Sequence, residues 1–62
     1  MENEIRIDRA ITALEAGYPE KEDNLFSRIS DLLTDLMHFA RQQGIEFSRC
    51  LLVAEINFES EK

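Results

Sequence analysis

Apolar residues recur through the middle of the chain at the spacing of an α-helix. Between residues 24 and 43 they fall at intervals of three and four, which gathers them on one side of a helix and leaves polar residues on the other. Asp23 or Asn24 is suited to cap its start, and Gly44 to close its end. The apolar arc covers roughly 160°, wider than the ~100° of one contact face, so we expect this helix to touch two neighbours. The arc consists of Leu25, Phe26, Ile29, Leu32, Leu33, Leu36, Met37, Phe39 and Ala40.

A second helix is predicted before this one. It should end just before Gly17, because glycine suits the left-handed position after a helix and Pro19 cannot continue one. Its start is open, since Asn3 and Asp8 are both plausible caps. The alternation over residues 5–7 also allows a short extended arm, so the first seven residues are either helical or extended. The apolar stripe of this helix is Ile7, Ala10, Ile11, Leu14 and Tyr18.

The last segment is apolar on two sides. Ser48 is a possible helix cap, and the run of residues 49–59 favours helix over the alternative of a strand at residues 51–54. One apolar group is Phe47, Cys50, Leu51, Ala54 and Phe58, and the other is Leu52, Val53 and Ile56. A helix that is apolar nearly all round has to be buried nearly all round, and a three-helix monomer of this size has no place to bury it.

The length of the chain points to the same conclusion. Sixty-two residues make one small domain, residues 1–62, whose core only about offsets the conformational entropy of ordering it. Cys50 is the single cysteine and His38 the single histidine, so an internal disulfide or a structural zinc site is not expected. The sequence therefore predicts an all-α fold of two to three helices that forms a helical bundle by homodimerisation. The predicted interface residues are Leu33, Leu36, Met37, Leu52, Val53 and Ile56.

Charge restricts the partners that we expect. The chain carries 13 acidic and 7 basic residues and a net charge of −6, which disfavours direct contact with nucleic acid or anionic membranes and permits a basic protein partner. The start of the chain is polar and no apolar run approaches 18 residues, so neither a signal peptide nor a membrane span is expected, and cytoplasmic residence follows. A negative patch that imitates nucleic acid is one reading of the acidic residues, and simple solubility is the other. The candidates are Glu20, Glu22, Asp23, Asp31, Asp35, Glu55, Glu59 and Glu61.

One cluster has the residue types of a metal site. Asp31, Asp35 and His38 follow at spacings of four and three, which places them on one side of the central helix. That side is polar, so a solvated helix face is the simpler interpretation, although a dimer that joined two such clusters would favour metal. Cys50 is better explained as a small core residue than as a nucleophile. With two glycines the chain has no phosphate-binding loop, and we expect no cofactor and more readily a non-enzyme than an enzyme.

Part of the sequence resembles a pattern found in short uncharacterised proteins of bacterial chromosomes, phages and plasmids. The pattern is ISDLLTDLMHF at residues 29–39, followed by the GIEF of residues 44–47 and a last helix that contains Ala54. The resemblance covers about the C-terminal two thirds and implies no activity.

Two functions follow as hypotheses. The first is a small acidic helical interaction or regulatory protein, encoded on a mobile element, that acts on a basic protein partner. The alternative is a small metal- or nucleotide-handling protein that uses Asp31, Asp35 and His38 across a dimer.

Overall fold

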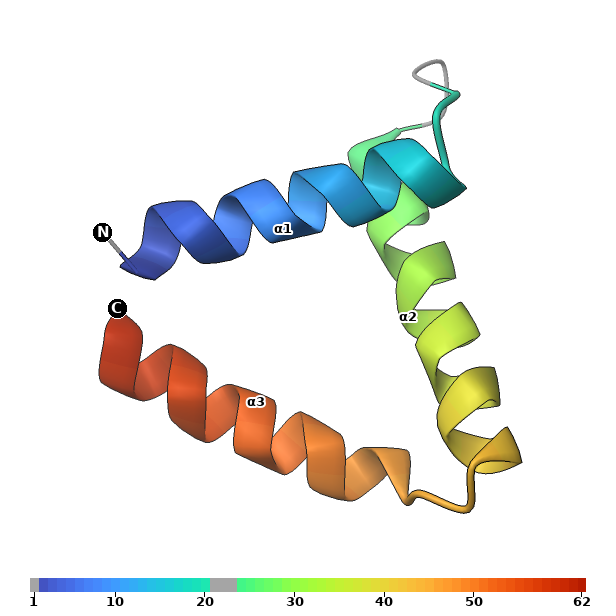
Figure 1. Ribbon diagram of the computed structural model, residues 1–62, viewed down its shortest axis with the longest axis vertical. Coiled ribbons are helices and arrows are strands. Elements are labelled where there is room, and N and C mark those ends of the chain that lie inside the picture. The colour runs from blue at the N-terminus through green and yellow to red at the C-terminus, as the bar shows by residue number, and fades with distance from the viewer. Residues whose placement is uncertain (1, 21–23) are drawn as a thin grey trace.

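The described part of the chain is entirely helical. The computed structural model describes residues 2–20 and 24–62, and these form three α-helices and no strand (Figure 1). Helix α1 spans Glu2–Gly17, α2 spans Leu25–Gln42 and α3 spans Phe47–Glu61. The predicted all-α fold is thus confirmed, and the alternative of a strand within the last segment is wrong.

The central helix has the ends that its sequence predicts. The Asn24 side chain accepts a hydrogen bond of 2.8 Å from the backbone N–H of Ser27, which satisfies a donor that the first turn leaves free. Asp23, the other predicted cap, lies outside the described residues. At the far end Gly44 has a φ of 73°, and the Ile45 N–H donates to the carbonyl of Ala40 at 2.9 Å. This pairing is a Schellman motif, which ends α2 sharply and turns the chain toward α3.

We expect opposite effects from alanine at the two glycines. Gly44→Ala should destabilise the fold by about 1 kcal/mol, because a side chain strains the left-handed backbone although no atom lies within 4 Å of the added Cβ. Gly17→Ala should stabilise it by about 0.5 kcal/mol, because Gly17 is helical and its surroundings are equally open. Urea denaturation of both variants checks this, and equal effects of the two substitutions would contradict the assignment.

Three local predictions are corrected. Gly17 is the last residue of α1 and not a left-handed residue after it, because the Tyr18 N–H still donates to Leu14, at 2.7 Å, in the helical pattern. Helix α1 begins at Glu2, so the starts predicted after Asn3 or Asp8 come too late and the extended arm is wrong.

The cap of α3 is the third correction. Ser48 lies inside the helix, because the Arg49 N–H already bonds to the carbonyl of Glu46, at 3.1 Å, and Glu46 occupies the cap position without a side-chain hydrogen bond.

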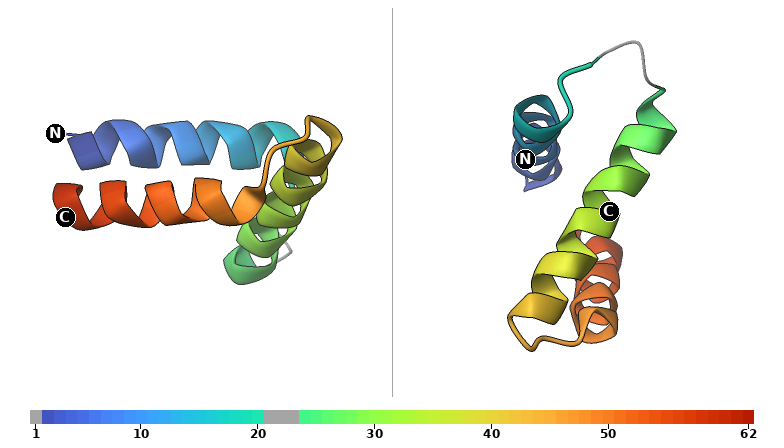
Figure 2. Two further views of the ribbon diagram at one scale, coloured as in Figure 1. Left: turned by 90° about the horizontal axis from the view of Figure 1, so that it is seen from below. Right: turned by 90° about the vertical axis from the view of Figure 1, so that its right-hand side faces the viewer.

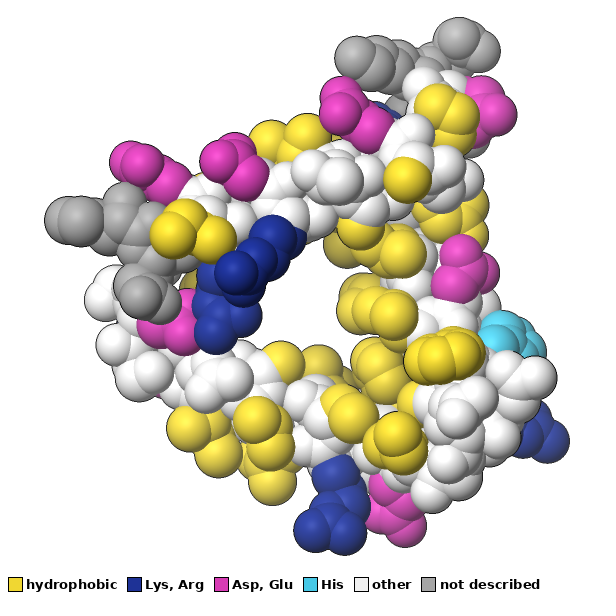
Figure 3. All heavy atoms as spheres, in the orientation of Figure 1, with side chains coloured by type: hydrophobic (Ala, Val, Ile, Leu, Met, Phe, Trp, Pro, Cys, Tyr) yellow, Lys and Arg dark blue, Asp and Glu magenta, His cyan; other side chains and the backbone are white. Residues whose placement is uncertain are grey.

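The three helices are arranged as the sides of a triangle (Figures 1 and 2). The C-terminal end of α1 packs against the start of α2, and the start of α3 packs near the end of α2. The N-terminal end of α1 and the C-terminal end of α3 meet at the third corner, where Arg6 binds Glu61. In the space-filling view an opening remains in the middle, and none of the described elements covers it (Figure 3). We call this opening the hollow.

This arrangement buries little apolar surface. Among the described residues, the buried apolar side chains are Leu14 of α1 and Ala40 of α2. Large apolar side chains stay exposed on all three helices: Ile5, Ile7, Ile11, Leu25, Phe26, Ile29, Leu33, Leu36, Met37, Phe39, Leu51, Leu52, Val53, Ile56 and Phe58, with Ile45 between α2 and α3.

The total surface gives the same result. A compact monomer of 7.2 kDa is expected to expose about 4,100 Å², and this chain exposes 5495 Å². The excess is about 1,400 Å² per chain. The radius of gyration of 12.8 Å likewise exceeds the value of about 10.5 Å expected for a compact chain of this length.

Candidate functional site

Tyr18 joins the end of α1 to α2. Its hydroxyl donates a hydrogen bond to Oδ2 of Asp35, and its backbone carbonyl accepts one of 3.0 Å from Nε of Arg28. Arg28 and Asp35 are seven residues apart and therefore lie on the same side of α2, so Tyr18 contacts two turns of this helix. The sequence placed Tyr18 on an apolar stripe but did not indicate this role. The sequence feature that could have indicated it is the position of Tyr18 beside the only proline, just before a helix with a polar side that carries Asp35.

The bond to Asp35 changes the acidity of the tyrosine. It raises the pKa of Tyr18 to about 12, with desolvation and the negative charges of Asp35 and Asp31 acting in the same direction. Each of these causes favours the neutral phenol over the phenolate. The hydroxyl is therefore a hydrogen-bond donor, and not a base, over the whole neutral range.

This shift predicts a loss of stability at high pH. A group whose pKa is higher in the folded state stabilises the fold below its unfolded pKa and loses that contribution as the pH rises through the folded value. Stability should therefore fall between about pH 10 and pH 12. Tyr18 is the single tyrosine, so the near-ultraviolet band of phenolate follows it alone. In Asp35→Asn the absorbance transition should move toward pH 10, and an unmoved transition would contradict the bond.

The predicted metal residues share an exposed side of α2. Asp31, Asp35 and His38 are all exposed, and Asp35 is engaged by Tyr18. Within a single chain, residues 2–20 and 24–62 contain no group of three His, Cys, Asp or Glu side chains placed to hold a metal ion. His38 lies instead beside Thr34, Met37 and Arg41 around a shallow depression. A site made from two copies of this cluster stays a prediction.

The predicted interface residues are all accessible. Leu33, Leu36 and Met37 on α2 and Leu52, Val53 and Ile56 on α3 each expose between 44% and 59% of their surface. Cys50, which we expected in a core, is exposed as well, because α3 packs on α2 only near its start. These side chains are available to a partner, and which of them it covers stays a prediction.

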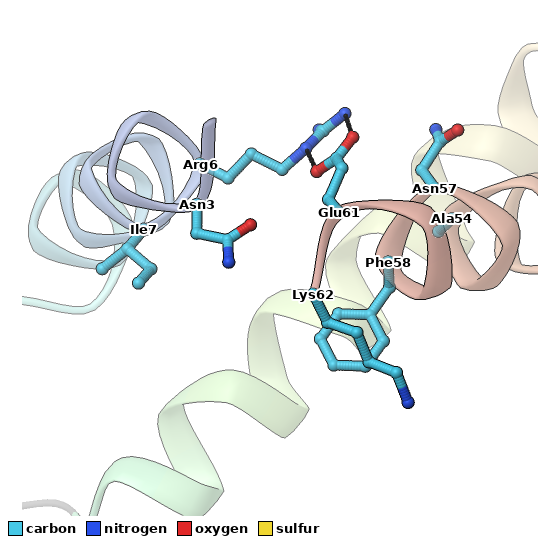
Figure 4. Close-up of a pocket in the computed structure, with 8 residues that line it drawn as sticks. All are labelled: Asn3, Arg6, Ile7, Ala54, Asn57, Phe58, Glu61 and Lys62. Carbon is cyan, nitrogen blue, oxygen red and sulfur yellow. Dashed lines mark hydrogen bonds and ion pairs between the residues drawn. The ribbon is translucent and has the colours of Figure 1, made fainter. Parts of the chain in front are cut away.

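A cavity of about 530 Å³ opens between the N-terminal end of α1 and the C-terminal end of α3 (Figure 4). Apolar side chains of both helices face it, among them Ile7 and Phe58, and polar groups stand around them. The Arg6 side chain reaches from α1 to Glu61 of α3, with Nη2 at 2.8 Å from Oε2 and Nε bonded to the other carboxylate oxygen. The remaining lining residues are Asn3, Ala54, Asn57 and Lys62.

The Arg6–Glu61 pair closes the triangle. Its hydrogen bonds lower the pKa of the Glu61 carboxyl, against the opposing effect of desolvation. Glu61 thus stabilises the closed corner above its unfolded pKa, and this contribution is lost as the pH falls through the folded value. The pair is not predictable from the sequence, because its members are 55 residues apart.

Removing this pair should loosen one corner only. In Glu61→Gln we expect faster amide hydrogen exchange in the first turns of α1 and the last turn of α3, with exchange at the α1–α2 and α2–α3 corners unchanged. Glu59→Gln is the matched control, because it removes one negative charge from the same turn but breaks only a pair with Lys62 at 3.1 Å inside α3. Equal exchange in both variants would show that the ion pair does not hold the corner.

The acidic side chains do not form one patch on the visible face. In Figure 3 they lie at separate places, most of them on the outer margin, with basic side chains between some of them. Glu61 is paired with Arg6, and Glu22 and Asp23 lie outside the described residues. The negative character is therefore spread over the exposed outer side, where Asp31, Glu55 and Glu59 lie.

None of the described helices is long and apolar enough to cross a membrane. No protein-family model, no curated protein and no solved structure matches the chain.

Proposed function

We propose that this chain is a non-enzymatic interaction module that associates with copies of itself and presents an acidic outer side to a basic protein partner. The observation that supports it best is the exposure of the apolar residues on all three helices. Stable domains consist of two or more packed layers that enclose a core. A frame of three helices around an uncovered hollow lacks the second layer, and a partner surface has to provide it.

The amount of exposed surface suits a second copy. An excess of about 1,400 Å² on each of two chains is about 2,800 Å² in total, within the range of 2,000–5,000 Å² typical of obligate homodimers. The predicted interface residues on α2 and α3 are among the exposed apolar side chains. Sedimentation equilibrium at micromolar concentration tests the proposal, and a stable folded monomer would contradict it.

The acidic outer side supports the choice of a basic partner. The net charge of −6 attracts positively charged proteins over a distance of about a Debye length, and it repels phosphate backbones. Capture of a basic protein by the immobilised chain at low salt, with release at high salt and loss of capture in the double variant Asp8→Asn/Asp31→Asn, would support this part, since both residues are exposed and lie away from α3. Capture that is insensitive to salt, or equal in the variant, would contradict it.

A further inference from the structure

Each of the three helices turns an apolar side toward the hollow. On α1, Ile7, Ile11 and Leu14 follow at helical spacing, and Leu14 is buried toward α2. On α3, Ala54 and Phe58 line the same cavity as Ile7 of α1. The stripes of α1 and α3 thus face each other across the opening, and the apolar arc of α2 joins them. We call these surfaces the inner faces.

Among the described helices, α3 alone has a second apolar strip on the side away from the hollow. The outward sides of α1 and α2 are mostly polar. A depression on α1 is lined by Asp8, Arg9, Thr12 and the single apolar residue Ile5, and one on α2 by Thr34, His38, Arg41 and the single apolar residue Met37. On α3, by contrast, Leu52, Val53 and Ile56 are apolar and exposed and lie opposite the inner face. We call these three residues the outer strip of α3. In a single chain these three side chains stay exposed to solvent.

We propose that the hollow is a helix-binding site whose occupant is α3 of a second copy, seated through its outer strip. This inference rests on the self-association proposed above and adds which surfaces meet. The outer strip of one chain then lies on the inner faces of the other, and Ile56 of one chain contacts Ile7 and Phe58 of its partner.

The dimensions decide how the helix is seated. Helices of 16, 18 and 15 residues form a triangle whose centre lies only about 7 Å from each axis. Packed helices need 8–10 Å between their axes. The partner's α3 is therefore laid over the opening and does not pass through it, and the dimer forms without breaking the Arg6–Glu61 pair.

The test is an isotope-filtered nuclear Overhauser experiment on a dimer mixed from labelled and unlabelled wild-type chains. We expect intermolecular signals from the Ile56 methyl groups to Ile7 and Phe58. A dimer whose intermolecular signals connect only α2 to α2, for example through Leu33 and Met37, overturns the inference and leaves the proposed self-association standing. A monomer at millimolar concentration overturns both.

A pair of variants gives a second measurement. Ile56→Glu should weaken the dimer at least about 100-fold, because the contact would bury an unpaired carboxylate. Thr34→Glu is the matched control, since it adds the same charge at an exposed position on the outward side of α2, away from the outer strip, and it should change the dissociation constant less than about 5-fold. Equal weakening in both variants overturns the assignment of the outer strip.

Discussion

Dilution of the protein is expected to unfold it. Because the described residues bury only Leu14 and Ala40 among their apolar side chains, a separated chain has little core to offset the entropy lost on folding. Association and folding are then one equilibrium, and the midpoint of thermal unfolding should rise with protein concentration. Over a thousandfold range of concentration the free energy of unfolding should change by about 4 kcal/mol per mole of dimer.

The measurement is circular dichroism at several concentrations, combined with sedimentation of the same samples. Helix content and mass should fall together on dilution. A midpoint that does not depend on concentration, in samples that sediment as monomers, would show that the single chain is stable by itself. Loss of mass without loss of helix would separate association from folding and contradict the coupling.

Leu14→Ala is the substitution expected to cost most at a single corner. Leu14 is buried where α1 meets α2, and its carbonyl also accepts the hydrogen bond that continues α1 to Tyr18. Removal of a buried leucine side chain costs about 2–5 kcal/mol. We expect the lower half of this range, because the site lies near the surface and can collapse in part. Urea denaturation at fixed protein concentration should show a midpoint shift of the corresponding size.

Ile5→Ala is the control for this variant. Ile5 is also an apolar residue of α1, but it is exposed and lies off the stripe that contains Leu14. Its replacement should cost less than about 1 kcal/mol, since little surface is uncovered and alanine favours helix. If both variants lose the same stability, the packing of Leu14 on α2 is not what holds this corner.

Local features were predictable from the sequence because local chemistry determines them. The Asn24 side chain and the left-handed Gly44 define the two ends of α2 through hydrogen bonds and backbone geometry that involve only neighbouring residues. Both predictions are confirmed. The start of α1 and the cap of α3 were predicted wrongly for one reason. Asn3, Asp8 and Ser48 are good caps in isolation, but α1 already begins at Glu2, and at α3 the Glu46 carbonyl already accepts a bond from Arg49, so a later cap is unnecessary.

The long-range features were not predictable in the same way. Periodicity gave the apolar arcs but not the angles at which the helices meet, which depend on packing at the corners. The bonds of Tyr18 to Asp35 and of Arg6 to Glu61 join residues 17 and 55 positions apart, and no local pattern connects them. The solvated-face interpretation of Asp31 and His38 agrees with their exposure, since both lie on the outside of α2.

The pair that closes the third corner has a consequence in polymer terms. Joining residues 55 positions apart makes a loop of nearly the whole chain, and in a flexible chain the entropy lost in closing it exceeds what one exposed ion pair returns. The pair forms here because the three helices pack against one another at the other two corners, which has already brought the ends together. The distance between Arg6 and Glu61 therefore depends on the angles between the helices at both of the other corners. A distance probe at these two positions would detect a change of angle at either corner.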